Sequence, residues 1–142
     1  MSSRRNVNKI NKILEKFHFS TFEILKICKK IEPNNVDLNW LAQQISFARD
    51  ADPTLIMGKS KDKLWNYRKQ IVAKDIDFFM NNNFKKYIKD DGNKKFMYTL
   101  LLAVKRGYKK LSEEEKEYIW VQVQNLLECC IKYKMEIGDA FE

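Results

Sequence analysis

The stretch Ser112-Glu-Glu-Glu-Lys-Glu-Tyr-Ile-Trp-Val-Gln-Val-Gln-Asn-Leu-Leu-Glu-Cys-Cys-Ile-Lys-Tyr-Lys-Met135 decides the fold class of this chain. Ser112 and Glu115 have the spacing of a capping box, in which each side chain bonds the backbone N–H of the other residue. Acidic residues in the first turn also favour a helix start. Apolar residues then recur every three or four positions, which predicts a long helix over 113–135. The apolar stripe comprises Ile119, Trp120, Val123, Leu126, Leu127, Cys130 and Ile131.

The same helical spacing recurs along most of the chain, and no segment alternates as a strand would. A second capping box, Ser20 to Glu23, predicts a helix start after a first helix that ends at Phe17. Gly58 is expected to end a short helix that starts at Asp52-Pro53. The full set of expected helices covers about 6–17, 20–31, 37–48, 52–57, 60–73, 75–80, 84–88, 93–108 and 113–135, the segment 84–88 being only a brief turn.

Composition places the chain among globular proteins of one domain. It has 142 residues, of which 44% are hydrophobic, 13% aromatic and 32% charged, with only 4 Gly and 2 Pro. That is enough apolar material to bury a core without a metal or a disulfide, and it excludes collagen-like and disordered classes. We therefore expect an all-α fold: a single compact multi-helix domain over residues 1–142, with about six to eight helices, no sheet, and residues 1–5 as a flexible N-terminal tail.

The chain carries no predicted export or membrane signal. The three cysteines, Cys28, Cys129 and Cys130, form no disulfide framework, which favours a reducing compartment. Because Cys129 and Cys130 are adjacent on a helix, we expect at most one of them to face the core. The N-terminus lacks the apolar run of a signal peptide, and no apolar run reaches the length of a membrane span. We expect an intracellular protein that is not secreted.

Three short motifs suggest chemistry, and each has a stronger structural interpretation. Gly58-Lys-Ser60 ends like a phosphate-binding loop, but the upstream glycine and preceding strand of that motif are missing. His18 is expected in a partly exposed turn, and it shares no metal-ligand spacing with the cysteines. Asp75 and Asp77 resemble a cation pair, but helix capping explains them better. We therefore predict no catalytic residue, no metal and no cofactor.

The positive charge is concentrated in two segments. The net charge of +8 divides into +6 for residues 1–31, −3 for 32–58, +10 for 59–110 and −5 for 111–142. Clustered Lys and Arg bind phosphate backbones without reading sequence, although lysine is also an ordinary residue of solvated helix surfaces. The candidates for contact with a partner or a phosphate are Lys61, Lys63, Arg68, Lys69, Lys85, Lys86, Lys94, Lys95, Arg106 and Lys109.

Two further stretches carry a family resemblance. Lys63-Leu-Trp-Asn-Tyr-Arg-Lys-Gln-Ile71, followed by Asp75-Ile-Asp-Phe-Phe79, resembles a pattern in small helical proteins of nucleocytoplasmic large DNA viruses. Leu111-Ser112, Lys116, Ile119-Trp120 and Gln124-Asn-Leu-Leu127 resemble the end of the same proteins, so the similarity covers about residues 38–133. Those proteins largely lack an assigned activity. The motif positions are Trp65, Tyr67, Arg68, Gln70, Ile71, Phe78, Phe79 and Trp120.

The resemblance and the absence of a catalytic constellation lead to one functional expectation. The chain should be a non-enzymatic interaction or structural protein of a large DNA virus, such as a minor capsid or core component of the virion. The resemblance implies other viral proteins as partners and a location in the virion or in the cytoplasm or nucleus of the host cell. The alternative is a nucleic-acid-binding module that uses the basic segment 59–110.

Overall fold

The computed structural model describes residues 3–82 and 95–139, and these residues form seven α-helices, one 3-10 helix and no strand. This confirms the expected all-α class. The helices are α1 (Ser3–Ile31), α2 (Val36–Ala51), α3 (Leu55–Asn66), α4 (Arg68–Val72), α5 (Ile76–Asn81), α7 (Lys95–Gly107) and α8 (Glu113–Ile137), with the 3-10 helix η2 (Tyr108–Lys110) between the last two.

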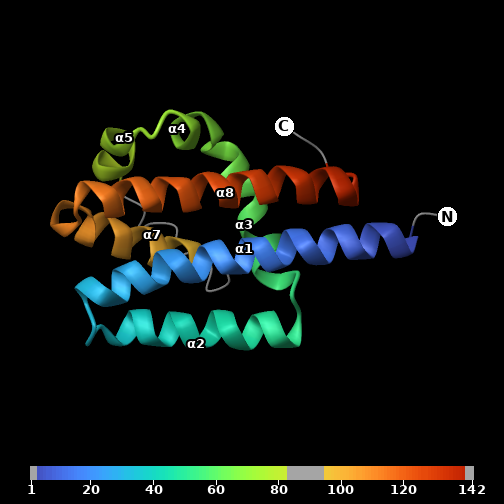
Figure 1. Cartoon of the computed structure of the whole chain (residues 1–142), viewed down its shortest axis with the longest axis horizontal. Coiled ribbons are helices and arrows are strands. Elements are labelled where there is room, and N and C mark those ends of the chain that lie inside the picture. Colours follow the sequence, from blue (N-terminus) through green and yellow to red (C-terminus); the bar gives the residue numbers. More distant parts are fainter. Residues whose placement is uncertain (1–2, 83–94, 140–142) are drawn as a thin grey trace.

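The two longest helices, α1 and α8, run side by side in opposite directions and pack on each other more extensively than any other pair (Figure 1). Helix α2 lies along the opposite side of α1 and forms the lower edge of the molecule in that view, while α4 and α5 lie above α8. Helix α3 crosses between these levels. The core therefore sits around α1 and α8, and its fully buried members include Phe17, Ile24, Leu41, Ile45 and Leu126.

Helix α8 begins as its sequence predicts. The Ser112 hydroxyl accepts from the Glu115 N–H at 3.1 Å, and the Glu115 carboxylate accepts from the Ser112 N–H at 3.0 Å. The capping box is therefore confirmed. At the other end Gly138 adopts φ +72°, the left-handed conformation that terminates helices and favours glycine.

The second predicted capping box is wrong, because α1 continues without interruption through Ser20. Ser20 and Thr21 are fully buried, and the Thr21 hydroxyl donates to the Phe17 carbonyl at 2.9 Å, a bond within the helix. No Pro or Gly interrupts the segment, so the apolar stripe passes from Phe17 to Ile24 unbroken. Residues 3–5, for which we expected a tail, also belong to the helix backbone.

The helix expected over 37–48, for which Asp37 is the N-cap candidate in the sequence, starts at Val36 instead. Asn35, rather than Asp37, precedes α2, and its side-chain oxygen accepts from the Leu38 N–H at 3.2 Å. Asp37 lies in the first turn of α2, where its negative charge interacts favourably with the positive end of the helix dipole. Asp75 is confirmed as the N-cap of α5, since its carboxylate accepts from the Phe78 N–H at 3.1 Å.

Helix α3 runs through Gly58, which we expected to end a helix. The actual break falls at Tyr67, between α3 and α4, so the expected helix over 60–73 is two helices joined at that residue. Helix α3 continues because Ile56, Met57 and Leu64 present one buried face. A glycine in a helix interior costs stability but does not end the helix when the flanking residues pack.

Replacing Gly58 with alanine should raise the free energy of unfolding by about 0.5 to 1 kcal/mol. Gly58 is exposed near the start of α3, and a Cβ atom there would meet nothing within 4 Å. Alanine removes conformational freedom from the unfolded chain without a clash. Urea unfolding followed by circular dichroism measures the change. Gly138→Ala is the matched control, because φ +72° should make that alanine destabilising; a neutral or negative effect of Gly58→Ala would contradict the account.

Candidate functional site

The positions that carry the family resemblance gather around one aromatic cluster. The ring of Phe79 lies 6.0 Å from Tyr67, 5.2 Å from Phe78 and 6.0 Å from Trp120, measured between centroids. These rings come from α5, α8 and the break between α3 and α4. The Trp120 indole N–H also donates to the Tyr108 hydroxyl at 3.0 Å. The aromatic motif residues thus hold α5 against α8.

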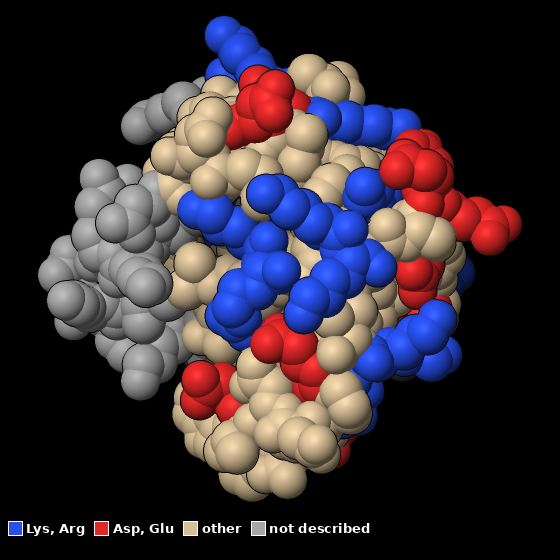
Figure 2. Space-filling model, turned by 90° about the vertical axis from the view of Figure 1, so that its left-hand side faces the viewer, with Lys and Arg blue, Asp and Glu red and all other residues tan. Residues whose placement is uncertain are grey.

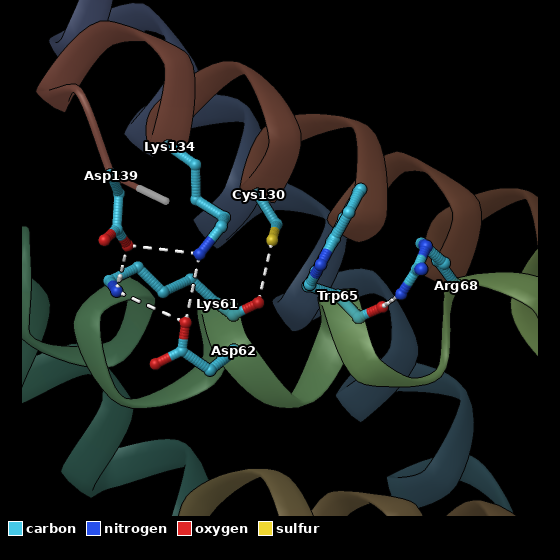
Figure 3. Close-up of polar contacts among 7 residues, drawn as sticks. All are labelled: Lys61, Asp62, Trp65, Arg68, Cys130, Lys134 and Asp139. Carbon is cyan, nitrogen blue, oxygen red and sulfur yellow. Dashed lines mark hydrogen bonds and ion pairs between the residues drawn. The ribbon is translucent and has the colours of Figure 1, made fainter. Parts of the chain in front are cut away.

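The remaining motif residues stabilise the break between α3 and α4. The Arg68 guanidinium donates to the Trp65 carbonyl at 2.9 Å and lies 4.1 Å from the centroid of the Trp65 ring (Figure 3). Ile71 is 2% exposed. The Gln70 side-chain oxygen is buried and accepts no hydrogen bond among the residues that the structure describes. Arg68, the first residue of α4, is therefore bound to the last turn of α3.

A small apolar cavity of about 110 Å³ lies next to this cluster. Side chains from α1, α3, α4, α5, α7 and α8 line it, including Ile24, Leu64, Leu100 and Trp120. Of the two lysines at its wall, Lys105 donates to the Asn82 carbonyl at 2.7 Å. The cavity has apolar walls and belongs to the core beneath the aromatic cluster.

A charge network joins α3 to the end of α8 (Figure 3). The Lys134 ammonium, whose side chain is 2% exposed, lies 3.1 Å from both Asp62 and Asp139. Lys61 lies 2.5 Å from Asp139 and 3.4 Å from Asp62. The Cys130 thiol donates to the Lys61 carbonyl at 2.9 Å. We call the four charged residues the α3–α8 charge network.

The pKa values in this network follow its hydrogen bonds. The bond from Lys134, together with the nearby Lys61 charge, lowers the pKa of Asp62. The bond to Asp139 raises the pKa of Lys61. Burial acts to lower the pKa of Lys134, but its two carboxylate partners outweigh burial and raise it. All three groups therefore stay charged near neutral pH, and Lys61, predicted as a phosphate contact, is engaged within the fold.

The other predicted basic contacts are dispersed over the molecule. Lys63 is half-buried at the cavity wall, and Lys69 is exposed on α4. Lys95 is the first residue of α7. Lys85, Lys86 and Lys94 lie outside the described residues. The segment 59–110 as a whole is therefore not one basic surface in the part of the chain that the structure describes.

Arg106 and Lys109 do belong to a common surface, together with residues that the sequence analysis did not select. The last turn of α1 carries Lys29 and Lys30, the last turn of α7 carries Arg106, and η2 carries Lys109 and Lys110. A Cβ atom on Gly107 would lie 3.1 Å from Ile31 Cδ1, so these helix ends adjoin. Figure 2 shows Lys and Arg side chains clustered at the centre of this end of the molecule. We call Lys29, Lys30, Arg106, Lys109 and Lys110 the basic end face.

The outer face of α2 is the second surface that the sequence analysis missed. Val36, Trp40 and Phe47 are 77%, 43% and 73% exposed. Their spacings of four and seven residues place them on one stripe of the helix. The opposite stripe of α2 is buried and comprises Leu38, Leu41, Ile45 and Ala48. The sequence contained a sign of this surface, because α2 carries a second apolar stripe in addition to the one that packs on the core.

The candidate nucleophiles are buried. Burial raises the pKa of Cys28 to about 12 and, with smaller contributions from neighbouring charges, the pKa of Cys129 and Cys130 to about 11. Cys129 and Cys130 are both buried, which corrects the expectation that only one faces the core, because α8 packs against α1 and α3 on different sides. His18 lies within α1 and is 4% exposed, rather than in a turn, and burial lowers its pKa.

Native protein should therefore react slowly with a thiol reagent such as 5,5′-dithiobis(2-nitrobenzoate). A thiol must ionise and be reached before it attacks, and all three thiols are buried with raised pKa values. In denaturant all three should react at the rate of an ordinary cysteine. Absorbance of the released thiolate at neutral pH measures both rates. A burst of reaction in the native protein would reveal an accessible thiolate and contradict this assignment.

Three further observations apply to the described residues. No group of three or more His, Cys, Asp and Glu side chains is arranged to hold a metal ion in that part of the chain. Asp77 is exposed in the first turn of α5, next to the N-cap Asp75. Among the described helices, none has the length and apolar character to cross a membrane.

The fold and its surfaces thus define an all-helical protein with an apolar outer helix and a basic end. Its sequence matches no family of known proteins, and no curated protein or solved structure shows significant similarity to it. The functional argument consequently depends on the surfaces themselves.

Proposed function

We propose that this chain is a non-enzymatic interaction protein of a large DNA virus, and that it binds another viral protein in the virion or in the infected cell. The observation that carries the proposal is the exposed apolar stripe of α2. An amphipathic helix of an isolated domain presents its apolar side to the core and polar residues to water. Helix α2 presents Val36, Trp40 and Phe47 to water in addition to a complete buried stripe.

The stripe fits a partner helix with apolar residues and basic flanks. Helix-in-groove and helix-on-helix recognition uses apolar anchors at spacings of three, four and seven residues. Asp37 and Asp50 are exposed near the two ends of the stripe, and residues 32–58 carry a net charge of −3. Basic residues beside the apolar anchors of the partner would complement these carboxylates.

The viral part of the proposal is supported by the resemblance over residues 38–133. The cysteines support the non-enzymatic part of the proposal. Their thiols are buried and have raised pKa values, which makes them poor nucleophiles. The motif residues Tyr67, Phe79 and Trp120 pack against one another rather than around a reactive group. This arrangement suits a protein that acts through its surface.

A crosslinking experiment in infected cells tests the proposal. The tagged protein should crosslink to one viral protein through residues near α2, and mass spectrometry of purified virions should find both. The double variant Val36→Lys with Phe47→Lys should lose this crosslink, because it places two charges in the stripe. Val72→Lys with Ile137→Lys is the matched control, since both side chains are exposed elsewhere, and it should retain the partner.

Three outcomes would overturn the proposal: no viral partner and no protein in the particles, loss of the partner in both double variants, or retention in both. A stable monomer in size-exclusion chromatography of the purified protein is expected for both variants. Circular dichroism checks that each variant remains helical.

A further inference from the structure

The basic end face brings together positive charge from three helix ends. Its five side chains come from α1, α7 and η2, which are more than 70 residues apart in sequence at their extremes. Figure 2 shows Lys and Arg side chains gathered at the centre of this end of the molecule, with acidic side chains beside them. The tertiary structure therefore concentrates positive charge that the sequence divides between the segments 1–31 and 59–110.

Much of this charge is not neutralised by the fold. Lys30 pairs with Glu115 at 3.1 Å and Arg106 with Glu32 at 3.4 Å. The side chain of Lys30 is 75% exposed, and exposed pairs of this kind are weak enough to exchange one anionic partner for another. Lys29, Lys109 and Lys110 form no ion pair with any described residue, and Lys109 and Lys110 are exposed. Among the described residues, two of the five cations thus pair with a carboxylate and three do not.

We propose that the basic end face binds the phosphate backbone of double-stranded nucleic acid without reading base sequence. Lys and Arg side chains that contact phosphates release condensed counterions, which supplies the binding free energy. The five described residues of this face supply cations, and none of them offers an aromatic ring on which bases could stack. Tyr108, which precedes Lys109 in η2, is half-buried with the Lys116 ammonium 5.2 Å from its ring centroid. Duplex backbone is therefore a better match than single strands, whose binding sites use stacking.

The acidic residues around the basic end face favour a duplex over an anionic membrane as its partner. Exposed acidic residues lie at the start of α8, at Glu113 and Glu114, and in the first turn of α2, at Asp37. A flat bilayer would bring these carboxylates toward anionic headgroups together with the lysines. A narrow duplex can contact the basic end face and leave the acidic surroundings in water. This inference is independent of the α2 stripe and of the proposed protein partner.

Fluorescence anisotropy with a short labelled DNA duplex of arbitrary sequence tests the inference. Five phosphate contacts predict that log K falls with log salt concentration with a slope of about −4.5 between 50 and 200 mM. Lys29→Glu, Lys109→Glu and Lys110→Glu combined should weaken binding more than about tenfold and reduce the slope to about −2, because two contacts remain. Two duplexes of unrelated sequence should bind equally.

The matched control carries the same change in net charge at other exposed lysines: Lys9→Glu, Lys12→Glu and Lys16→Glu. It should bind within about threefold of the unchanged protein, apart from long-range effects that salt screens. Equal losses in both triple variants would mean that net charge acts rather than this face, and would overturn the inference. So would absence of duplex binding at 50 mM salt, tighter binding to a single strand, or binding only to vesicles of phosphatidylserine and phosphatidylcholine.

Discussion

Replacing Phe17 with alanine should lower the free energy of unfolding by about 3 to 5 kcal/mol, the largest effect that we expect of any single substitution in this chain. The Phe17 side chain is fully buried in the middle of α1, where that helix packs on α8. Truncation removes its apolar contacts and leaves a cavity that the long rigid helices can only partly close. Urea unfolding measured by tryptophan fluorescence gives the change.

Phe19 provides the control for this prediction within the same helix. It is 59% exposed, so Phe19→Ala should change stability by no more than about 0.5 kcal/mol. If Phe17→Ala does not fold, Phe17→Leu should still fold and lose about 1 kcal/mol. Similar losses at positions 17 and 19 would contradict the assignment of the buried face of α1.

Replacing Lys134 with alanine should cost about 2 kcal/mol, through the loss of charge-assisted hydrogen bonds to Asp62 and Asp139. The Lys134 side chain is almost inaccessible to water, and its removal leaves both carboxylates in contact with Lys61. Lys132→Ala is the control. Lys132 lies two residues earlier on α8 and pairs with Glu128 on the surface, so its loss should cost no more than about 0.5 kcal/mol.

The pH dependence of stability provides a second measure of the same network. The pKa of Asp62 is lowered in the folded state, so the ionised carboxylate stabilises the fold above its unfolded pKa. That stabilisation is lost as the pH falls through the lowered pKa, below about pH 4. Lys134→Met keeps an apolar stem and should flatten this acid limb. An acid limb identical to that of the unchanged protein would show that the Lys134 ammonium does not stabilise the Asp62 carboxylate.

The two capping boxes illustrate how far local sequence determined the fold. Ser112 to Glu115 and Ser20 to Glu23 have the same pattern, and only the first starts a helix. A proline or a polar turn precedes most helix starts in this chain, whereas the segment before Ser20 is helical and apolar. The buried stripe on both sides of Ser20 gains more from one continuous helix than the cap would contribute. The Ser-x-x-Glu pattern alone does not show whether the buried stripe or the cap contributes more stability.

The candidate surfaces show the same division. Arg106 and Lys109 were identifiable from charge clustering, but Lys29 and Lys30 joined them only because the ends of α1 and α7 adjoin at Ile31 and Gly107. Lys61 carries the same charge but forms an ion pair with Asp139 within the fold. Whether a lysine is free for a partner depends on neighbours that are distant in sequence, which periodicity and composition do not report.

The sequence by itself determined the all-α class, most helix positions and the capping of α5 and α8, because helical periodicity and caps depend on residues within about one turn of each other. The tertiary structure decided that α1 is one helix, that both Cys129 and Cys130 are buried, and that the basic residues meet at one end. Those properties depend on which helices pack against each face. Packing is set by the sum of many long-range contacts, each of which a local pattern leaves undetermined.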